Sequence, residues 1–369
     1  MVYHNTQLIK NLSDLLHEES AHHIFLVHGK HSYVASGAAA ALNPLLQNFE
    51  VTEFTDFTSN PKYEDALKGV ETLKQAKADC VIGVGGGSCM DMAKLIRHFY
   101  VNDPDNDCDY LPLVVIATTA GTGAEETQFA VCYRDGVKTS VSHPSMLPDR
   151  GIICPEFTYH NSQYLTAQTG FDALAQAIEA FWNVNANEGS DEVAELAIRD
   201  LLANLPNLVH NLNNHGLRDI VAEGANYAGM AINITRTTAP HAISYTMTSH
   251  YGYPHGHAVA LTFPYFAQLN ISCPEKYYQG RDYPRYSGKM EWLIGHINGF
   301  YDLGMNVNES NLYEYFKKYT KEIGLGYDPA NRPIDYETVA KGINIERAKN
   351  NPHILNEDVI LKAAKSIKD

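Results

Sequence analysis

The chain has 369 residues, of which 44% are hydrophobic and 10% aromatic, enough for two or three domains with large cores. Its 28 Lys and Arg against 43 Asp and Glu give a formal charge of −15, which argues against binding to nucleic acids or anionic membrane surfaces. The longest apolar runs are far shorter than the ~20 residues that cross a bilayer. The first residues lack the pattern of a secretory signal, and the six cysteines are never spaced as CxxC. These features predict a cytoplasmic enzyme with reduced thiols.

Residues 1–160 alternate short apolar runs with amphipathic stretches. The apolar runs predict strands over residues 24–28, 51–55, 80–84 and 113–118. The amphipathic stretches predict helices over residues 34–47, 60–76 and 88–100. Asn60 and Pro61 are expected to open the second of these helices, as N-cap and first helical residue. Because continuously apolar strands are buried on both faces, this alternation predicts an α/β domain built on a parallel sheet.

The pattern changes over residues 161–369, where we expect an all-α domain. Apolar positions recur at helical spacing over residues 167–182, 190–208, 217–232, 291–301 and 310–323. No convincing strand pattern separates these segments. The stretch 273–289, rich in Tyr, Pro, Gly and Arg, is expected to be an exposed loop.

A glycine-rich turn joins the predicted strand 80–84 to the helix that follows it. Glycines at 85–87 let backbone N–H groups approach a phosphate, the helix N-terminus favours an anion, and Ser88 supplies a hydroxyl. A tight turn without a ligand is the alternative interpretation. Asp91 and Lys94 follow on one helix face, where they could form a surface ion pair of little energetic value.

A second polar loop follows the next predicted strand. It contains Thr118, Thr119 and Thr122 together with Gly121 and Gly123. Ligands of doubly wound sheets bind at the carboxyl ends of the strands. Two such loops on neighbouring strands therefore predict a dinucleotide site.

The helical half contains a candidate metal site. Asp172 and Gln176 are four residues apart and so lie on one helix face. His241 and His255 follow, the latter in a Pro-His-Gly sequence that predicts a rigid turn. Two imidazoles and a carboxylate suit Fe²⁺ or Zn²⁺, and three protein ligands leave an open position for catalysis. The alternative is that these histidines are ordinary core or surface residues.

Taken in order along the chain, these motifs resemble the iron-containing (group III) alcohol dehydrogenase family. The matching segments are 85–94, 118–122, 170–174, 254–257 and the late Asn-Asn-Pro at 350–352. The resemblance implies a dehydroquinate synthase-like fold. In that fold a Rossmann-like domain (1–160) and a helical domain (161–369) hold NAD(P) and a divalent metal between them, and a homodimer is common. The dinucleotide site would be lined by Asn60, Gly86, Gly87, Ser88, Asp91, Thr118, Thr119, Thr122 and Lys138. The metal would be bound by Asp172, Gln176, His241 and His255.

The sequence departs from the family pattern at three places. Gln176 stands where the family has a histidine, so the metal is held either by four ligands including this neutral amide or by the other three alone. Tyr245 replaces a further histidine, and the proton of the reaction would pass through Tyr245, water or ribose hydroxyls. After the first strand the chain has Gly29-Lys30 in place of an acidic residue, which permits NADP(H) as well as NAD(H).

A narrower resemblance concerns the substrate. Residues 233–245 and the Asp172–Gln176 variant resemble the phosphonoacetaldehyde reductase branch, which is similar to 2-hydroxyethylphosphonate dehydrogenases. Arg236, flanked by Asn and Thr side chains, suits a phosphonate or carboxylate anion. Lys30 or Arg199 could serve instead. Arg236 could also be a solvated helix-end residue or an ion-pair partner.

The sequence thus predicts an oxidoreductase that interconverts an aldehyde and its primary alcohol, with phosphonoacetaldehyde as the favoured substrate. A general short-chain alcohol, lactaldehyde or propanediol dehydrogenase is the nearest alternative. A dehydroquinate-synthase-like lyase and a non-catalytic nucleotide-binding protein are the remaining alternatives. The metal, the choice of NADH or NADPH and the oligomeric state stay open.

Overall fold

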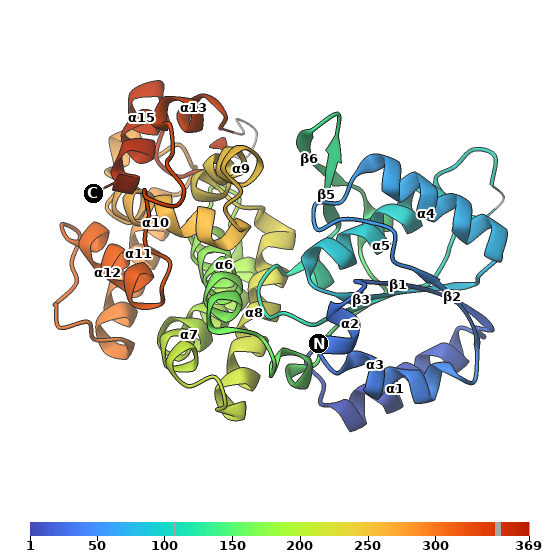
Figure 1. The fold of residues 1–369 in the computed structure, drawn as a ribbon. Helices are drawn as coiled ribbons and strands as arrows, with labels where there is room; N and C mark the ends of the chain where they lie inside the picture. Colours follow the sequence, from blue (N-terminus) through green and yellow to red (C-terminus); the bar gives the residue numbers. More distant parts are fainter. Residues whose placement is uncertain (107, 344–347, 369) are drawn as a thin grey trace. The chain divides into compact units, whose positions relative to one another are not determined.

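The chain forms two compact units, Met1–Asn161 and Ser162–Asp369, in a computed structural model that describes residues 1–106, 108–343 and 348–368. Figure 1 shows strands and helices in the first unit and helices in the second. Among the described residues, no helix combines the length and the apolar character needed to cross a membrane.

The first unit is built on a parallel five-stranded sheet, as the sequence predicts. The strands are β1 (His23–His28), β2 (Glu50–Phe54), β3 (Cys80–Gly85), β4 (Leu113–Ala117) and β7 (Arg150–Ile153), in the order β2-β1-β3-β4-β7. In the central pairs, Ile24 lies between Val51 of β2 and Cys80 of β3. β7 joins β4 at the edge and is an addition to the four predicted strands.

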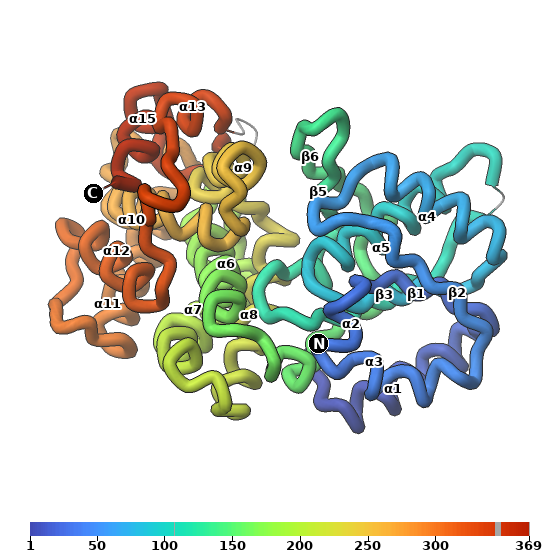
Figure 2. The backbone as a smooth tube through the Cα atoms, in the orientation of Figure 1, coloured from blue at the N-terminus to red at the C-terminus, as the bar shows by residue number. Residues whose placement is uncertain are grey.

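Helices cover both faces of this sheet, as Figure 2 shows. On one side α1 (Asn5–Glu18), α2 (Ser32–Ala35) and α3 (Ala38–Leu46) cover the face that carries Ile24, Leu26 and Ile82. On the other side lie α4 (Tyr63–Ala76) and α5 (Gly87–Val101). A Cβ atom on Gly83 would lie 2.7 Å from the Cβ of Ala93, so α5 packs directly on the backbone of β3. This close packing fixes where the glycine turn at the start of α5 lies.

Two expectations for this unit are wrong in detail, and one further element was not expected. The helix predicted over 34–47 is two helices, because Gly37 adopts a left-handed φ of 83° between them. The helix expected to open at Asn60 begins at Tyr63, because the Pro61 carbonyl accepts a hydrogen bond from the Tyr133 N–H (2.7 Å) and holds the chain extended. That partner lies on an antiparallel hairpin of β5 (Phe129–Arg134) and β6 (Val137–Ser142), which the sequence patterns did not reveal.

The second unit is helical, as predicted, and its described residues contain no strand. Its helices are α6 (Gln163–Trp182), α7 (Glu188–His210), α8 (His215–Thr235), α9 (Ala239–Tyr251), α10 (His255–Ile271), α11 (Tyr283–Phe300), α12 (Leu312–Glu322), α13 (Tyr336–Lys341) and α15 (Glu357–Lys365). Short 3-10 helices in the two units are η1 (Ala124–Glu126), η2 (Pro144–Met146), η3 (Pro155–Thr158), η4 (Glu275–Tyr277) and η5 (Ser366–Lys368). The predicted loop over 273–289 is therefore wrong in part, because Asp282 caps α11 with its side chain.

An aromatic core fixes the positions of α6 and α10. Phe263 of α10 stacks on Trp182 (ring centroids 5.6 Å apart) and meets Phe171 edge-on (5.4 Å). Phe316 of α12 packs edge-on against the same ring. All four side chains are buried, and each contributes the large apolar area that makes aromatic residues dominant in cores. The two helices that carry Asp172 and His255 are thereby held rigidly.

Candidate metal centre and dinucleotide loops

In the first unit, the two polar loops predicted to bind a dinucleotide lie side by side at the carboxyl ends of β3 and β4. The Thr118 N–H donates to the Gly85 carbonyl (2.9 Å). A Cβ on Gly87 would lie 2.8 Å from a side-chain carbon of Thr122, and one on Gly86 would lie 3.5 Å from Oγ1 of Thr119. Gly86 caps α5, whose first-turn N–H groups point out of the helix N-terminus. The arrangement has the chemistry of a phosphate cradle.

The segment before α4 is fastened to the same turn. The hydroxyl of Ser88 donates to the carbonyl of Ser59, next to Asn60. Asn60 is exposed in this segment, and its carbonyl accepts a hydrogen bond from Thr58 (3.0 Å). Asn60 therefore does not cap a helix as predicted but lies in the segment beside the glycine turn. Its role in binding the cofactor stays a prediction.

Asp91 and Lys94 are not a surface pair, because both side chains are buried. Lys94 donates to Thr127 Oγ1 (3.0 Å) and to the Phe129 carbonyl (3.1 Å), while Asp91 accepts the Val131 N–H (2.9 Å). Burial raises the pKa of Asp91 to about 6 and lowers that of Lys94 to about 8, although each charge opposes the effect on the other. The pair fastens the loop and strand at 127–131 to α5.

Lys138 lies on β6, opposite Tyr133 of β5. Its charge favours the ionised form of Asp91, which counteracts part of the desolvation that raises the pKa of that carboxyl. The structure therefore brings Lys138 into the electrostatic surroundings of α5. The direct contact with a dinucleotide that the family resemblance implies for Lys138 and Asp91 stays a prediction.

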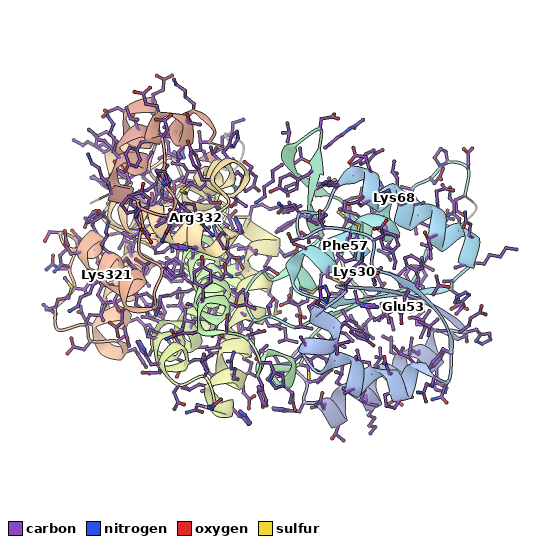
Figure 3. All side chains as sticks on the ribbon, viewed as in Figure 1. Lys30, Glu53, Phe57, Lys68, Lys321 and Arg332 are labelled. Atoms are coloured by element: carbon purple, nitrogen blue, oxygen red, sulfur yellow. The ribbon has the colours of Figure 1, made fainter. Side chains whose placement is uncertain are left out.

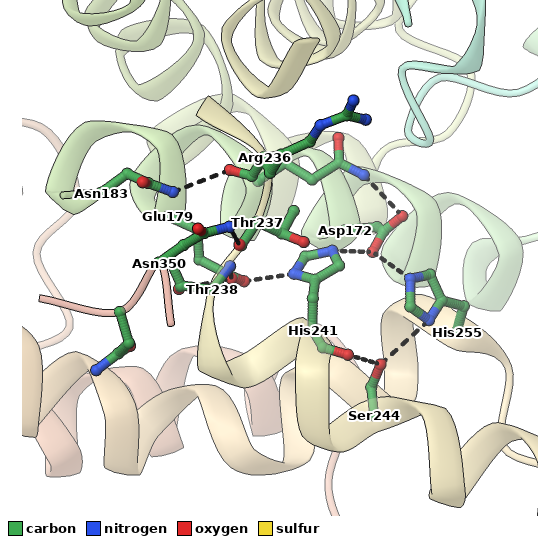
Figure 4. Close-up of polar contacts among 12 residues, drawn as sticks. Asp172, Glu179, Asn183, Arg236, Thr237, Thr238, His241, Ser244, His255 and Asn350 are labelled. Atoms are coloured by element: carbon green, nitrogen blue, oxygen red, sulfur yellow. Dashed lines mark hydrogen bonds and ion pairs between the residues drawn. The ribbon is translucent and has the colours of Figure 1, made fainter. Parts of the chain in front are cut away.

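In the second unit, Asp172, His241 and His255 converge, each offering a ligand atom within 4.8 Å of the others among the described residues (Figure 4). His241 Nε2 lies 3.3 Å from Asp172 Oδ1, and His255 Nε2 lies 3.9 Å from the same oxygen. The two imidazole rings are 5.3 Å apart and nearly perpendicular. Asp172 and His241 are buried, whereas the His255 side chain is 32% exposed. The cluster therefore has one open side.

Local sequence explains why three helices meet here. His255 is the first residue of α10, so the predicted Pro-His-Gly turn is instead a helix start preceded by Pro254. A Cβ on Gly256 would lie 1.9 Å from the Gln168 carbonyl oxygen and 3.1 Å from Asp172 Cβ. Only glycine lets α10 begin this close to α6, and this approach brings His255 to Asp172.

The hydrogen bonding of these donors fits a divalent cation. Across the described parts of the chain, Asp172 Oδ1 and His241 Nε2 are both buried and find no hydrogen-bond partner. Their separation of 3.3 Å puts them at ion-pair distance without hydrogen-bond alignment. Buried polar atoms left without partners cost free energy, and a metal bound between carboxylate oxygen and imidazole nitrogen would remove that cost.

Gln176 lies one turn after Asp172 on α6 and donates its amide N–H to Asp172 Oδ2 (3.2 Å). This hydrogen bond occupies the second carboxylate oxygen and leaves Oδ1 facing the histidines. Gln176 thus lies at the cluster as the sequence predicts. Its contribution as a fourth ligand stays a prediction.

The electrostatics of His241 are set by two carboxylates. Burial by itself would lower the pKa of its imidazole, but Glu179 and Asp172 on either side outweigh burial and raise that pKa to about 9. Figure 4 shows the ring between the two acidic side chains. Two acidic side chains therefore flank this imidazole.

Tyr245 and Arg236 lie on either side of His241 in the sequence. Tyr245 is one turn further along α9, with its ring 6.4 Å from that of His255. Arg236 ends α8 with φ 68° and ψ 179°, a conformation adopted almost exclusively by glycine. Asn183 Nδ2 and Thr235 Oγ1 hold its carbonyl (3.1 and 2.8 Å). In Figure 4 its guanidinium extends away from His241.

Two functional candidates escaped the sequence analysis in whole or in part. Glu179, a fully buried carboxylate, is seven residues after Asp172 and so on the same face of α6, a spacing that could have revealed it. Asn350, from the late Asn-Asn-Pro motif, donates to the Thr237 carbonyl (3.1 Å), a contact across more than a hundred residues that no local pattern predicts. Both residues hold the turn between α8 and α9.

Comparison with known sequences identifies the family. Residues 1–155 match the family described as "Iron-containing alcohol dehydrogenase", and residues 166–362 match "Fe-containing alcohol dehydrogenase family, C-terminal". The chain belongs to the iron-containing alcohol dehydrogenase family. The family expected from the motifs is therefore confirmed.

Relatives in this family have diverse substrates by name. A long-chain-alcohol dehydrogenase of Geobacillus thermodenitrificans is 34% identical over 63% of each chain, and a 1,3-propanediol dehydrogenase of Citrobacter freundii is 32% identical over 62% of each. The matched segment spans less than two thirds of these relatives' length. The crystal structure of a sulfoacetaldehyde reductase from Bifidobacterium kashiwanohense in complex with NAD+ is similar, with a TM-score of 0.82 and 26% identity over 99% of this chain and 96% of that one.

Proposed function

We propose that this protein is a metal-dependent NAD(P)H oxidoreductase that interconverts a small aldehyde and its primary alcohol. The observation that carries the proposal is that two buried ligand atoms, Asp172 Oδ1 and His241 Nε2, lack a hydrogen-bond partner among the described residues, with His255 completing the cluster. Membership of the iron-containing alcohol dehydrogenase family supports the same reaction.

The chain's residues divide between two cofactors. Asp172, His241 and His255 would hold Fe²⁺ or Zn²⁺, with Gln176 supporting Asp172 or acting as a fourth ligand. The loops at 86–88 and 118–122 would hold the dinucleotide phosphates. When bound, the metal supplies a Lewis acid that polarises the carbonyl, and the nicotinamide supplies the hydride.

Protein groups would complete the reaction on the partly exposed side of the cluster. Tyr245, one turn from His241, is our candidate for passing a proton to or from the substrate oxygen, with water or ribose hydroxyls as the other routes. The glycine at 256 keeps His255 against Asp172 and so fixes the donor geometry.

For the substrate we propose an anionic aldehyde, with phosphonoacetaldehyde favoured and Arg236 as the residue that binds the anion. The structural similarity to a sulfoacetaldehyde reductase supports an aldehyde carrying a charged group. The backbone of Arg236, held in a rarely populated conformation by Asn183 and Thr235, supports a specialised position for this side chain. The named propanediol and long-chain alcohol relatives favour a neutral substrate, which is the second candidate.

Cofactor choice depends on the residues around the end of β1. Lys30 follows this strand, and Glu53 lies on the neighbouring β2 with its carboxylate 3.4 Å from His28 Nε2 (Figure 3). The Lys30 ammonium would attract the 2′-phosphate of NADPH, whereas the carboxylate of Glu53 would repel it. We propose that both cofactors are accepted, and parallel assays with NADH and NADPH test this.

The deciding experiment compares phosphonoacetaldehyde with propionaldehyde, using protein reconstituted with Fe²⁺ or Zn²⁺ and following the absorbance of the reduced nicotinamide. We expect the anionic aldehyde to have the higher kcat/KM. Arg236→Ala should remove that advantage, and Arg199→Ala, which removes an exposed arginine paired with Glu195, should leave it.

Preference for propionaldehyde would refute the anionic substrate and the role of Arg236 while leaving the metal and hydride chemistry intact. Bound NAD⁺ without net turnover would indicate a lyase of the dehydroquinate synthase type. Protein that takes up neither metal nor dinucleotide would refute the enzyme function altogether.

A further inference from the structure

Glu179 is a fully buried carboxylate to which the proposed reaction scheme assigns no role. Its Oε1 pairs with Nδ1 of His241, and its Oε2 accepts hydrogen bonds from Thr238 N–H (2.6 Å) and Thr238 Oγ1 (2.8 Å). Burying an ionised carboxylate is costly unless it is hydrogen-bonded, and these contacts occupy both oxygens. The carboxylate therefore has a defined orientation and defined partners.

The contact with His241 fixes which ring nitrogen faces the cluster. Because Nδ1–H donates to Glu179, Nε2 is the nitrogen directed at Asp172 Oδ1, 3.3 Å away. A ring flip would break the bond to Glu179. In proteins generally, a carboxylate behind a histidine sets its tautomer and raises its strength as a ligand.

The carboxylate is itself held in place. Thr238 Oγ1, which donates to Glu179, also accepts a hydrogen bond from the indole N–H of Trp182 (3.0 Å). Trp182 is buried and stacked on Phe263. A rigid chain of contacts thus runs from the aromatic core through Thr238 and Glu179 to His241.

We propose that Glu179 is a positioning residue that holds the proton of His241 on Nδ1 and so keeps Nε2 available as a metal ligand. This inference rests on the proposed function only in assuming that the cluster binds a divalent metal. It assigns metal affinity to a residue that would not touch the metal. Residues in such positions typically contribute 10–100-fold to affinity.

Two variants separate this role from a merely structural one. Glu179→Gln keeps the shape, but its single carbonyl oxygen must accept the fixed Thr238 N–H, so its NH₂ faces Nδ1 of His241. Nδ1 must then be the acceptor and the ring proton moves to Nε2, the ligand atom. Thr238→Val is the matched control, since it removes hydroxyl hydrogen bonds to Glu179 and Trp182 but leaves the carboxylate on His241.

The readout is metal binding without turnover. Metal-stripped protein is titrated with Zn²⁺ against a chelating dye, and the visible absorption of Co²⁺ is recorded to report coordination. We expect Glu179→Gln to bind Zn²⁺ about 10–100-fold more weakly and to alter the Co²⁺ spectrum. Thr238→Val should lower the free energy of unfolding and weaken Zn²⁺ binding much less than Glu179→Gln does, with the wild-type Co²⁺ spectrum, because the Thr238 N–H still holds Glu179 on His241.

Wild-type affinity in Glu179→Gln would overturn the proposal, and so would equal losses in both variants, which would mean that Glu179 acts through the turn.

If Glu179→Gln does not fold, the wild-type protein decides. In Zn²⁺-loaded protein with ¹⁵N-labelled histidine, the retained ring proton of His241, assigned with His241→Gln, should be on Nδ1. A proton on Nε2 contradicts the proposal. A wild type that binds neither Zn²⁺ nor Co²⁺ refutes the proposed function and this inference together, whereas normal binding without turnover refutes only the function.

Discussion

Glu125 offers a quantitative test of the electrostatics of the first unit. It lies in η1, just after the polar loop at 118–122, and its side chain is 2% exposed. Within the described residues, its Oε1 has no hydrogen-bond partner. Burial, reinforced by the neighbouring charge of Glu126, raises the pKa of the Glu125 carboxyl from 4.5 to about 7. The folded protein therefore holds a proton that the unfolded chain releases.

The size and sign of the effect follow from these two pKa values. The rise from 4.5 to about 7 corresponds to about 3 kcal/mol at about 1.4 kcal/mol per unit. Because the folded state binds the proton more tightly, the stabilisation is complete below pH 4.5 and is lost as the pH rises through 7. Glu125→Gln removes the ionisation, so it should stabilise the protein by about 3 kcal/mol at pH 8 and by only about 1 kcal/mol at pH 5.

Urea unfolding at several pH values measures this difference. Far-UV circular dichroism follows the whole chain, whereas Trp fluorescence reports on the second unit, because Trp182 and Trp292 both lie there. If the two units unfold separately, the gain in unfolding free energy should appear only in the unfolding of the first unit, which circular dichroism detects and Trp fluorescence does not. A Glu125→Gln effect that is the same at pH 5 and pH 8 would refute the argument, since only a titrating carboxyl makes it depend on pH.

Two further substitutions test the packing that positions each site. Lys94→Met should destabilise the protein by about 3–5 kcal/mol, because it strands the buried Asp91, and adding Asp91→Asn should recover part of the loss in urea unfolding. A single variant as stable as the wild type would contradict the buried pair. Gly256→Ala should weaken Zn²⁺ binding and cost about 1–3 kcal/mol of stability, because its Cβ would lie 1.9 Å from a backbone oxygen of α6. Its control is Gly288→Ala in α11, where a Cβ would meet no described atom within 4 Å. Equal losses of stability and Zn²⁺ binding in the two variants would contradict the packing argument for Gly256.

Much of the fold was predictable because its signals are local. Strands β3 and β4 and the four central residues of β1 are continuously apolar, as expected for strands buried on both faces. Helices α6 to α8 carry apolar positions at helical spacing. The hairpin of β5 and β6 was missed because β6 has no apolar run and no buried residue, although β5 alternates between partly buried and buried positions. Its place is decided by contacts with Asp91 and Pro61.

The sequence by itself determined the identity of the ligand-type residues and their local spacing. Asp172 and Gln176 share a helix face whatever surrounds them, and a run of three glycines before a helix exposes backbone N–H groups in any fold. Such features depend only on the geometry of one helix or one turn.

Only the tertiary structure decided the environment of these groups. Lys94 reads as a surface residue in the sequence but is buried, because β5 covers it. Glu179 reads as one more helix residue, yet its carboxylate contacts His241 and Thr238 at the start of α9. Protonation, ligand orientation and the value of a buried charge depend on atoms brought from distant parts of the chain. Those contacts join residues far apart in the sequence, so local sequence patterns do not predict them.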